Sequence, residues 1–114
     1  MDAIKEKKLP TKFYQASSSE IFGHNTLPIT ENSSYNPISP YGISKASAHL
    51  IVKNYRESYG LFCCSGILFN HESYLRSSNF FVKKVITESI KIKKGKVDKL
   101  KVGNIDIKRD FGWA

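Results

Sequence analysis

Two short runs of the sequence carry side chains of the kinds that move protons. The run 39–45, SPYGISK, places Tyr41 and Lys45 four residues apart. Its first serine is a good helix N-cap and its proline suits the first helical position, so we expect a helix to begin here with both side chains on one face. A nearby ammonium favours phenolate and so lowers the pKa of a phenol. Tyr41 is therefore a candidate acid and base near neutral pH.

The tyrosine–lysine spacing is a weak signal when it is taken alone. Six tyrosines and 15 lysines among 114 residues give roughly 0.8 chance matches. Two other features strengthen it: Ser18 and Glu20 directly follow a predicted strand, and the run 70–73, NHES, follows another. Each residue also has a plainer interpretation, with Glu20 as a solvated loop acid and His71 as a polar side chain satisfied by a backbone carbonyl.

The elements that must position these residues alternate between helices and strands. The pattern predicts a helix tail over 2–8, a strand over 12–17, a polar loop over 23–38, and a helix over 40–59 that ends at a glycine. The apolar run 61–69 is typical of a parallel strand covered on both faces.

A third helix is expected to begin with Asn79 as its cap and to end at Gly95, and residues 99–102 are a candidate strand. We expect the apolar residues of this helix to face inward: Val82, Val85, Ile86 and Ile90. The alternation predicts an α/β fold with a parallel sheet flanked by helices. Ligands of such sheets bind beyond the carboxyl ends of the strands, where Ser18, Glu20, Asn70 and His71 are expected.

The positive charge of the chain needs an explanation. The formal net charge is +8, and eight lysines fall within residues 83–101. These lysines lack the interleaved arginines and aromatic residues of nucleic-acid footprints, so a solvated helix face is the favoured interpretation. We therefore expect no nucleic-acid partner, while attraction to an anionic small molecule is a third interpretation.

Composition and cysteine content indicate the compartment. At 114 residues, 40% hydrophobic and 25% charged, the chain is typical of one modest soluble domain. No apolar run approaches a membrane span and the first 12 residues do not resemble a signal peptide, so we expect a cytoplasmic protein without a membrane partner. Cys63 and Cys64 are adjacent, which predicts two buried reduced thiols, and no metal site is expected.

Five runs together resemble the family of GDP-mannose 4,6-dehydratases, within the extended short-chain dehydrogenase/reductases. They span nearly the whole chain: 13–20 (FYQASSSE), 39–45 (SPYGISK), 54–59 (NYRESY), 66–73 (GILFNHES) and 103–112 (GNIDIKRDFG). The resemblance implies a partial NAD(P)-binding Rossmann fold, with residues 1–114 forming its catalytic half and the start of a substrate-binding region. It also implies bound NADP, GDP-mannose as substrate, a role in GDP-fucose biosynthesis, and a homo-oligomeric enzyme.

The resemblance assigns catalytic roles to four residues. Ser18 holds the hexose 4-hydroxyl and Tyr41 takes its proton while hydride leaves C4 for the nicotinamide. Lys45 tunes Tyr41 and holds the nicotinamide ribose. Glu20 then removes the C5 proton, water leaves from C6, and the hydride returns to C6. A carboxylate two residues after the serine separates this chemistry from a plain alcohol dehydrogenase, because elimination needs a second proton-handling group.

Further binding roles follow from the same resemblance. Besides Tyr41 and Lys45, the residues implied to line the cofactor are His71 and Arg76. Those implied to face the nucleotide-sugar or its diphosphate, besides Ser18, are Asn70, Lys83 and Arg109.

The chain departs from the family pattern in three places. The family usually has threonine at Ser18 and a second arginine at Leu75, and its glycine-rich dinucleotide turn is missing here. We therefore expect an internal piece of a longer enzyme or a truncated gene product. The alternatives are another nucleotide-sugar epimerase, decarboxylase or dehydratase of the same family, a non-catalytic basic fragment that binds a polyanion, and a piece that folds incompletely alone.

Overall fold

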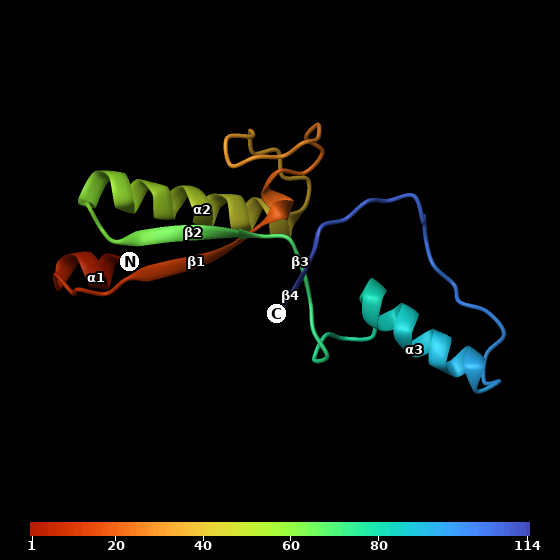
Figure 1. Ribbon diagram of the computed structural model, residues 1–114. Coiled ribbons are helices and arrows are strands. Elements are labelled where there is room, and N and C mark those ends of the chain that lie inside the picture. Colours follow the sequence, from red (N-terminus) through yellow and green to blue (C-terminus); the bar gives the residue numbers. More distant parts are fainter. The chain divides into compact units, whose positions relative to one another are not determined.

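The computed structural model describes residues 1–114, which form two compact units, residues 1–68 and 69–114. Figure 1 shows the elements in chain order. The first unit contains α1 (Asp2–Glu6), β1 (Phe13–Ser18), the short 3-10 helix η1 (Ser19–Ile21), α2 (Pro40–Tyr59) and β2 (Cys63–Leu68). The second contains β3 (Asn70–Glu72), α3 (Phe81–Lys93) and β4 (Phe111–Trp113). None of the helices combines the length and the apolar character needed to cross a membrane.

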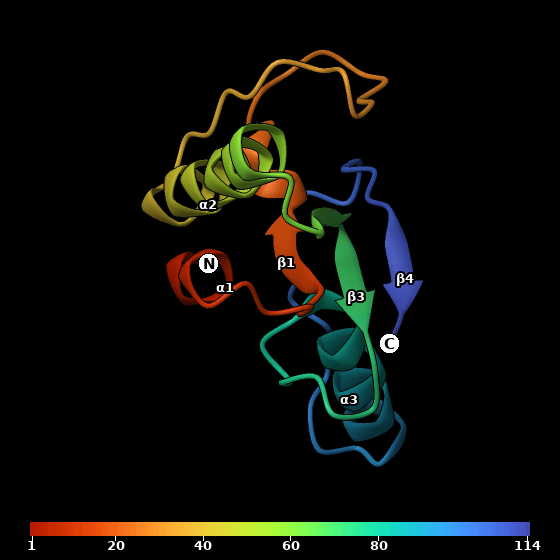
Figure 2. The same cartoon turned by 90° about the vertical axis from the view of Figure 1, so that its left-hand side faces the viewer.

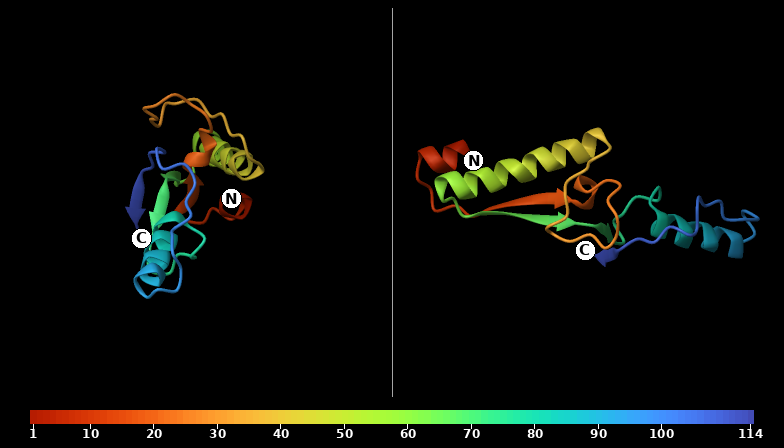
Figure 3. Two further views of the ribbon diagram at one scale, coloured as in Figure 1. Left: turned by 90° about the vertical axis from the view of Figure 1, so that its right-hand side faces the viewer. Right: turned by 90° about the horizontal axis from the view of Figure 1, so that it is seen from above.

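The first unit is a β1–α2–β2 arrangement with parallel strands. The register runs from the pair Phe13 and Cys63 to the pair Ser18 and Leu68, so both strands end at the same edge. Helix α2 runs along the two strands, as Figure 3 shows from above. The predicted alternation and the parallel pairing are therefore confirmed for this unit.

Both ends of α2 lie where the sequence predicts them, because the residues expected to start and to stop the helix do so. Ser39 is the N-cap, and its Oγ accepts a hydrogen bond from the backbone N–H of Gly42 at 3.0 Å. Pro40 occupies the first helical position. At the other end Gly60 adopts the left-handed conformation, with φ of 63°, and its N–H bonds to the carbonyl of Arg56.

The main hydrophobic core of the first unit lies beside the carboxyl end of β1. Ile21, Phe22 and Ala46 are buried together, with Ile29, Tyr35 and Ile67 packed partly against them. Full burial of a side chain such as Phe22 contributes about 1.5–3 kcal/mol. This core therefore fixes η1 against α2, at the end of the sheet where the candidate catalytic residues lie.

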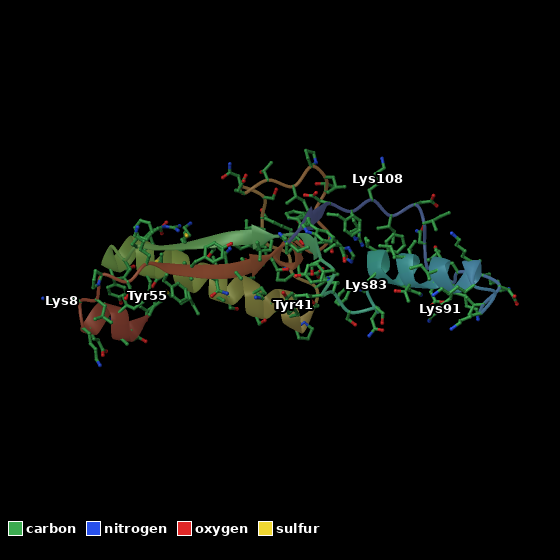
Figure 4. All side chains as sticks on the ribbon, turned by 60° about the horizontal axis from the view of Figure 1, so that its bottom comes forward. Lys8, Tyr41, Tyr55, Lys83, Lys91 and Lys108 are labelled. Carbon is green, nitrogen blue, oxygen red and sulfur yellow. The ribbon has the colours of Figure 1, made fainter.

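Helix α1 attaches to the far end of α2. The Tyr55 hydroxyl donates a hydrogen bond to the Asp2 carboxylate, and the Lys5 ammonium lies 4.3 Å from the centre of the Tyr59 ring. Figure 4 shows Tyr55 near α1 and Tyr41 at the opposite end of α2. The predicted helix tail over 2–8 is thus present, although it ends at Glu6.

Strand β2 is not covered on both faces within this chain, contrary to the prediction from its apolar run. Cys63 is buried and its thiol contacts the Val52 carbonyl at 3.3 Å, whereas Cys64 is exposed. Adjacent strand residues point to opposite faces, and α2 covers one of them. The prediction of two buried thiols is therefore right for Cys63 and wrong for Cys64, while both are free as expected.

The second unit contains a strand pair that the sequence pattern did not predict. Strands β3 and β4 are parallel and lie side by side, as Figure 2 shows. Asn70 is opposite Phe111, and Glu72 is opposite Trp113. Each strand has three residues, too few for an apolar period to be recognised. The candidate strand over 99–102 does not form, and these residues have no regular structure.

Helix α3 begins one residue later than predicted. Ser77 closes a turn, since its carbonyl accepts from the Phe80 N–H at 3.1 Å, and Phe80 rather than Asn79 is the N-cap. The predicted inward stripe is also not buried: Ile86 and Ile90 are half exposed and no residue of α3 is buried.

Gly42 is predicted to be required for the packing of α2 on η1. A Cβ at this position would lie 2.7 Å from the Glu20 carbonyl oxygen and 3.1 Å from the Pro37 Cβ. Alanine improves helix propensity by about 1 kcal/mol. Overpacking against backbone costs about 1–3 kcal/mol, so we expect Gly42→Ala to lower the free energy of unfolding in urea titrations followed by circular dichroism.

The matched control is Gly103→Ala, because nothing lies within 4 Å of a Cβ there. We expect this variant to unfold like the parent chain. A Gly42→Ala chain as stable as the parent would show that the close approach is not maintained in solution.

Candidate active site at the carboxyl end of β1

Ser18 and Glu20 lie where β1 ends and η1 begins. Ser18 keeps extended backbone geometry and is 8% exposed, and its Oγ accepts a hydrogen bond from the Glu20 N–H at 3.3 Å. Because the hydroxyl acts here as acceptor, its own proton is free to be donated. The Glu20 side chain is exposed to solvent. The pair therefore offers a fixed hydroxyl and an accessible carboxylate two residues apart.

Tyr41 lies in the first turn of α2, adjacent to the residue that packs on η1. The residue is 53% exposed. Figure 4 labels its side chain at this end of α2. The next residue, Gly42, approaches the backbone carbonyl of Glu20 closely. The structure thus brings Ser18, Glu20 and Tyr41 to the same end of the first unit, and their catalytic roles stay predictions.

Lys45 connects α2 to β1. Its Nζ donates a hydrogen bond to the Ala16 carbonyl at 2.9 Å and lies 5.6 Å from the centre of the Tyr41 ring. An ammonium carries three N–H donors, so two remain for a ligand. The ammonium is therefore placed beside the phenol by a backbone contact, and its effect on the acidity of that phenol stays a prediction.

Sequence reasoning missed a second link between β1 and α2. The Nδ1 of His49 lies 3.1 Å from the Oγ of Ser17, which is 2% exposed, and the Tyr35 ring packs edge-on against the imidazole with centroids 5.3 Å apart. His49 lies four residues after Lys45, so it shares that face of the helix. The spacing of four residues between Lys45 and His49 could have indicated this contact. The link holds the strand immediately before Ser18.

Burial lowers the pKa of His49, and the positive charges of Arg56 and Lys53 lower it further. All three causes disfavour the imidazolium, since burial removes its hydration and the two cations repel it. The ring is therefore held neutral near pH 7, and a neutral ring has one donor and one acceptor nitrogen for its contact with Ser17.

The other predicted residues belong to the second unit, where Asn70 and His71 contact backbone carbonyls. The Asn70 side-chain amide donates to the Asp110 carbonyl at 3.1 Å, a contact that connects the ends of β3 and β4. The Nδ1 of His71 lies 3.2 Å from the Phe69 carbonyl. A hydrogen bond there requires the proton on Nδ1 and leaves Nε2 as an acceptor.

The three cationic residues of this set also have local partners. Arg76 stacks on Phe80, with its guanidinium 3.5 Å from the ring centre, and its Nε lies 3.9 Å from the buried Glu72 carboxylate. Lys83 donates to the Tyr74 carbonyl at 2.6 Å. Arg109 is exposed and donates to its neighbour's carbonyl. The predicted binding roles of these residues remain predictions.

Comparisons with known proteins match the whole chain. The family model of GDP-mannose 4,6 dehydratase matches residues 1–114. GDP-mannose 4,6 dehydratase 2 of Arabidopsis thaliana is 50% identical over 103 residues, which is 90% of this chain and 28% of that protein. The human GDP-mannose 4,6 dehydratase is 45% identical over 117 residues, covering 100% of this chain and 32% of that protein.

A solved structure shares the fold. The structure of RMD from Pseudomonas aeruginosa, complexed with NADPH, matches with a TM-score of 0.86 and 27% identity. The match covers 98% of this chain and 39% of the other. The chain is therefore a partial NAD(P)-binding Rossmann fold, and it spans about a third or less of the curated relatives described above.

The environment of His49 predicts a pH-dependent stability. An unfolded histidine titrates near 6.5, and the pKa of His49 is lower in the folded chain. The unfolded state then binds more protons as the pH falls below 6.5, so the free energy of unfolding should decrease from there down to the folded pKa. We expect His49→Phe, which keeps a ring against Tyr35, to be less sensitive to pH in this window.

The control for this prediction is His24→Phe, because His24 is exposed in a loop. Its stability should follow the same pH dependence as the parent chain. An NMR titration that places the pKa of His49 at or above 6.5 would contradict the described environment.

Proposed function

We propose that this chain, which belongs to the GDP-mannose 4,6-dehydratase family, supplies the catalytic groups of an NADP-dependent conversion of GDP-mannose to GDP-4-keto-6-deoxy-mannose. One observation carries the proposal. Ser18, Glu20 and Tyr41 lie at the same end of the first unit, with Lys45 anchored between α2 and β1. An alcohol dehydrogenase needs only the hydroxyl, phenol and lysine, whereas a dehydratase also needs a carboxylate.

The residues present fit part of a nicotinamide dinucleotide. The two unused N–H donors of Lys45 and the exposed hydroxyl of Tyr41 suit the hydroxyls of the nicotinamide ribose. The pyrophosphate needs a glycine-rich turn that the 114 residues do not contain. NADPH is bound by the Pseudomonas aeruginosa neighbour, which favours NADP over NAD in the proposal.

The first chemical step uses Ser18 and Tyr41. The Ser18 hydroxyl donates a hydrogen bond to the 4-oxygen of the hexose, and the Tyr41 phenolate removes the proton of that hydroxyl. When bound, a nicotinamide cofactor would supply the acceptor for the hydride from C4 and the donor of the hydride to C6. The nearby ammonium of Lys45 stabilises the phenolate by its positive charge.

The second step belongs to Glu20. A ketone at C4 acidifies the C5 proton, and the Glu20 carboxylate removes it while the C6 hydroxyl leaves. That hydroxyl takes up the proton held by Glu20 and departs as water, so the sugar loses one molecule of water between C5 and C6. C5 then takes up a solvent proton when hydride is added at C6. The exposure of Glu20 suits this exchange, because the carboxyl must release and regain protons during each turnover.

Family membership supports the remaining assignments. We propose that His71 and Arg76 face the cofactor, and that Asn70, Lys83 and Arg109 face the nucleotide-sugar diphosphate. Cationic side chains suit a diphosphate, and Arg76 is held ready by its ring stack and its carboxylate partner. The enzyme is proposed to be a cytoplasmic homo-oligomer serving GDP-fucose biosynthesis.

The test uses two preparations, because the chain spans 32% of its human relative. One is the 114-residue chain, and the other is a chimaera in which the chain replaces the 117 aligned residues of that relative. Both are incubated with GDP-mannose and NADP and analysed by mass spectrometry. We expect loss of water from GDP-mannose in the chimaera.

Two variants of the chimaera assign the roles. Tyr41→Phe should reduce turnover by about 10²–10⁴-fold, the usual contribution of a positioned acid and base. Glu20→Gln should leave oxidation at C4 detectable as reduced cofactor while abolishing water loss. Tyr59→Phe, in the last turn of α2, is the matched control and should be fully active.

A Glu20→Gln chimaera that still releases water would overturn the role of Glu20. A folded, cofactor-binding chimaera that converts another nucleotide-hexose to its C4 epimer, and leaves GDP-mannose unchanged, would favour an epimerase of the same superfamily.

A further inference from the structure

A cavity in the first unit lies apart from the candidate active site. It has a volume of about 190 Å³ and lies between α2 and β2. Its lining contains none of the four proposed catalytic residues. The lining residues are Glu31, His49, Lys53, Arg56, Cys64, Ser65 and Ile67.

Positive charge converges on this cavity from one face of α2. His49, Lys53 and Arg56 follow one another at intervals of four and three residues, so their side chains project from the same side of the helix. The positive charges of Arg56 and Lys53 both contribute, after burial, to the lowered pKa of the neutral His49 ring. Both cations therefore line the same cavity, although the Lys53 side chain is also 54% exposed.

Arg56 is held in place by one hydrogen bond, and its other N–H donors are available to a ligand. Its Nη1 donates to the Cys63 carbonyl at 3.2 Å, which ties the guanidinium to the start of β2. A guanidinium has five N–H donors, so four remain for a ligand. Lys53 is only loosely paired, since its Nζ lies 4.0 Å from the Glu57 carboxylate on an exposed surface.

The wall of the cavity also holds an unused hydroxyl. The Oγ of Ser65 is buried and has no hydrogen-bond partner. A buried polar group without a partner is rare and calls for a ligand or water. Because a hydroxyl proton rotates freely about its bond, Ser65 can donate toward an anion held by Arg56.

We propose that this cavity binds the phosphate group, as inorganic phosphate or as the terminal group of a phosphomonoester. The space is smaller than the 300–1,000 Å³ typical of drug-sized ligands. A guanidinium, an ammonium and a hydroxyl are the donors that phosphate oxygens accept from.

Glu31 gives this site its selectivity. The carboxylate lines the same cavity, where it would repel an anion that carries no proton. Hydrogen phosphate has a P–OH that can donate to this carboxylate, whereas sulfate at neutral pH has none. The site therefore prefers hydrogen phosphate to sulfate.

The pKa of His49 should show whether the cavity holds a phosphate group. The groups that face it are Lys53 and Arg56 from α2, Ser17 from β1, Tyr35 and Glu31 from the loop, and Cys64 from β2. A bound dianion offsets the two cations that disfavour the imidazolium. The pKa of His49 should therefore rise when the cavity is filled.

The experiment is an NMR titration of the full 114-residue chain with sodium phosphate at constant ionic strength. We expect saturable shifts at Cys64 and Ser65 and a higher pKa of His49 at saturation. Sodium sulfate should give weaker shifts. Replacing Lys53 by Gln should weaken phosphate binding roughly tenfold, the effect of losing one charge-assisted contact, and Ser65→Ala should also weaken it.

Arg56→Gln should weaken binding most, but it also removes a backbone contact, so Lys53→Gln and Ser65→Ala keep the test valid if that variant unfolds. Lys101→Gln, an exposed lysine outside the cavity, is the control and should bind like the parent. The proposal is overturned by phosphate shifts that do not saturate, that sulfate reproduces equally, or that Lys53→Gln leaves unchanged.

Discussion

The first unit depends on the close packing of the first turn of α2 against the backbone of η1. This contact is possible because Gly42 has no Cβ to meet the Glu20 carbonyl, and because the Ser39 side chain caps the same turn. It joins two segments separated by a polar loop. The backbone contact therefore determines where Ser18, Glu20 and Tyr41 lie, and their side chains remain available for other partners.

Two of the groups proposed to react, Tyr41 and Glu20, are open to solvent, whereas Ser18 is 8% exposed. Below them, Ile21, Phe22 and Ser17 are 0, 1 and 2% exposed. Lys45 and His49 add two polar links from α2 to successive residues of β1. A site built in this way can exchange protons with solvent without losing its geometry.

Local signals predicted the first unit well. A capping serine, a proline and a terminal glycine predicted both ends of α2 correctly. The parallel pairing of β1 and β2 was predicted from the order of helices and strands. The His49 link was missed because its partners come from β1 and a distant loop. In the second unit, a three-residue strand is too short to show an alternation of apolar and polar residues. The turn that begins at Ser77 moved the start of α3. The exposed face of β2 could not be inferred, since an apolar run does not reveal which neighbours cover it.

The role proposed for Glu20, removal of the C5 proton during elimination, can be tested by isotope exchange. GDP-mannose carrying deuterium at C4 is converted in ordinary water, and unlabelled GDP-mannose is converted in D₂O, both by the chimaera that contains this chain. We expect the C4 label to appear at C6 and one solvent deuterium to appear at C5, with the C5 exchange lost in Glu20→Gln. Unchanged exchange at C5 in that variant would show that Glu20 does not remove the C5 proton.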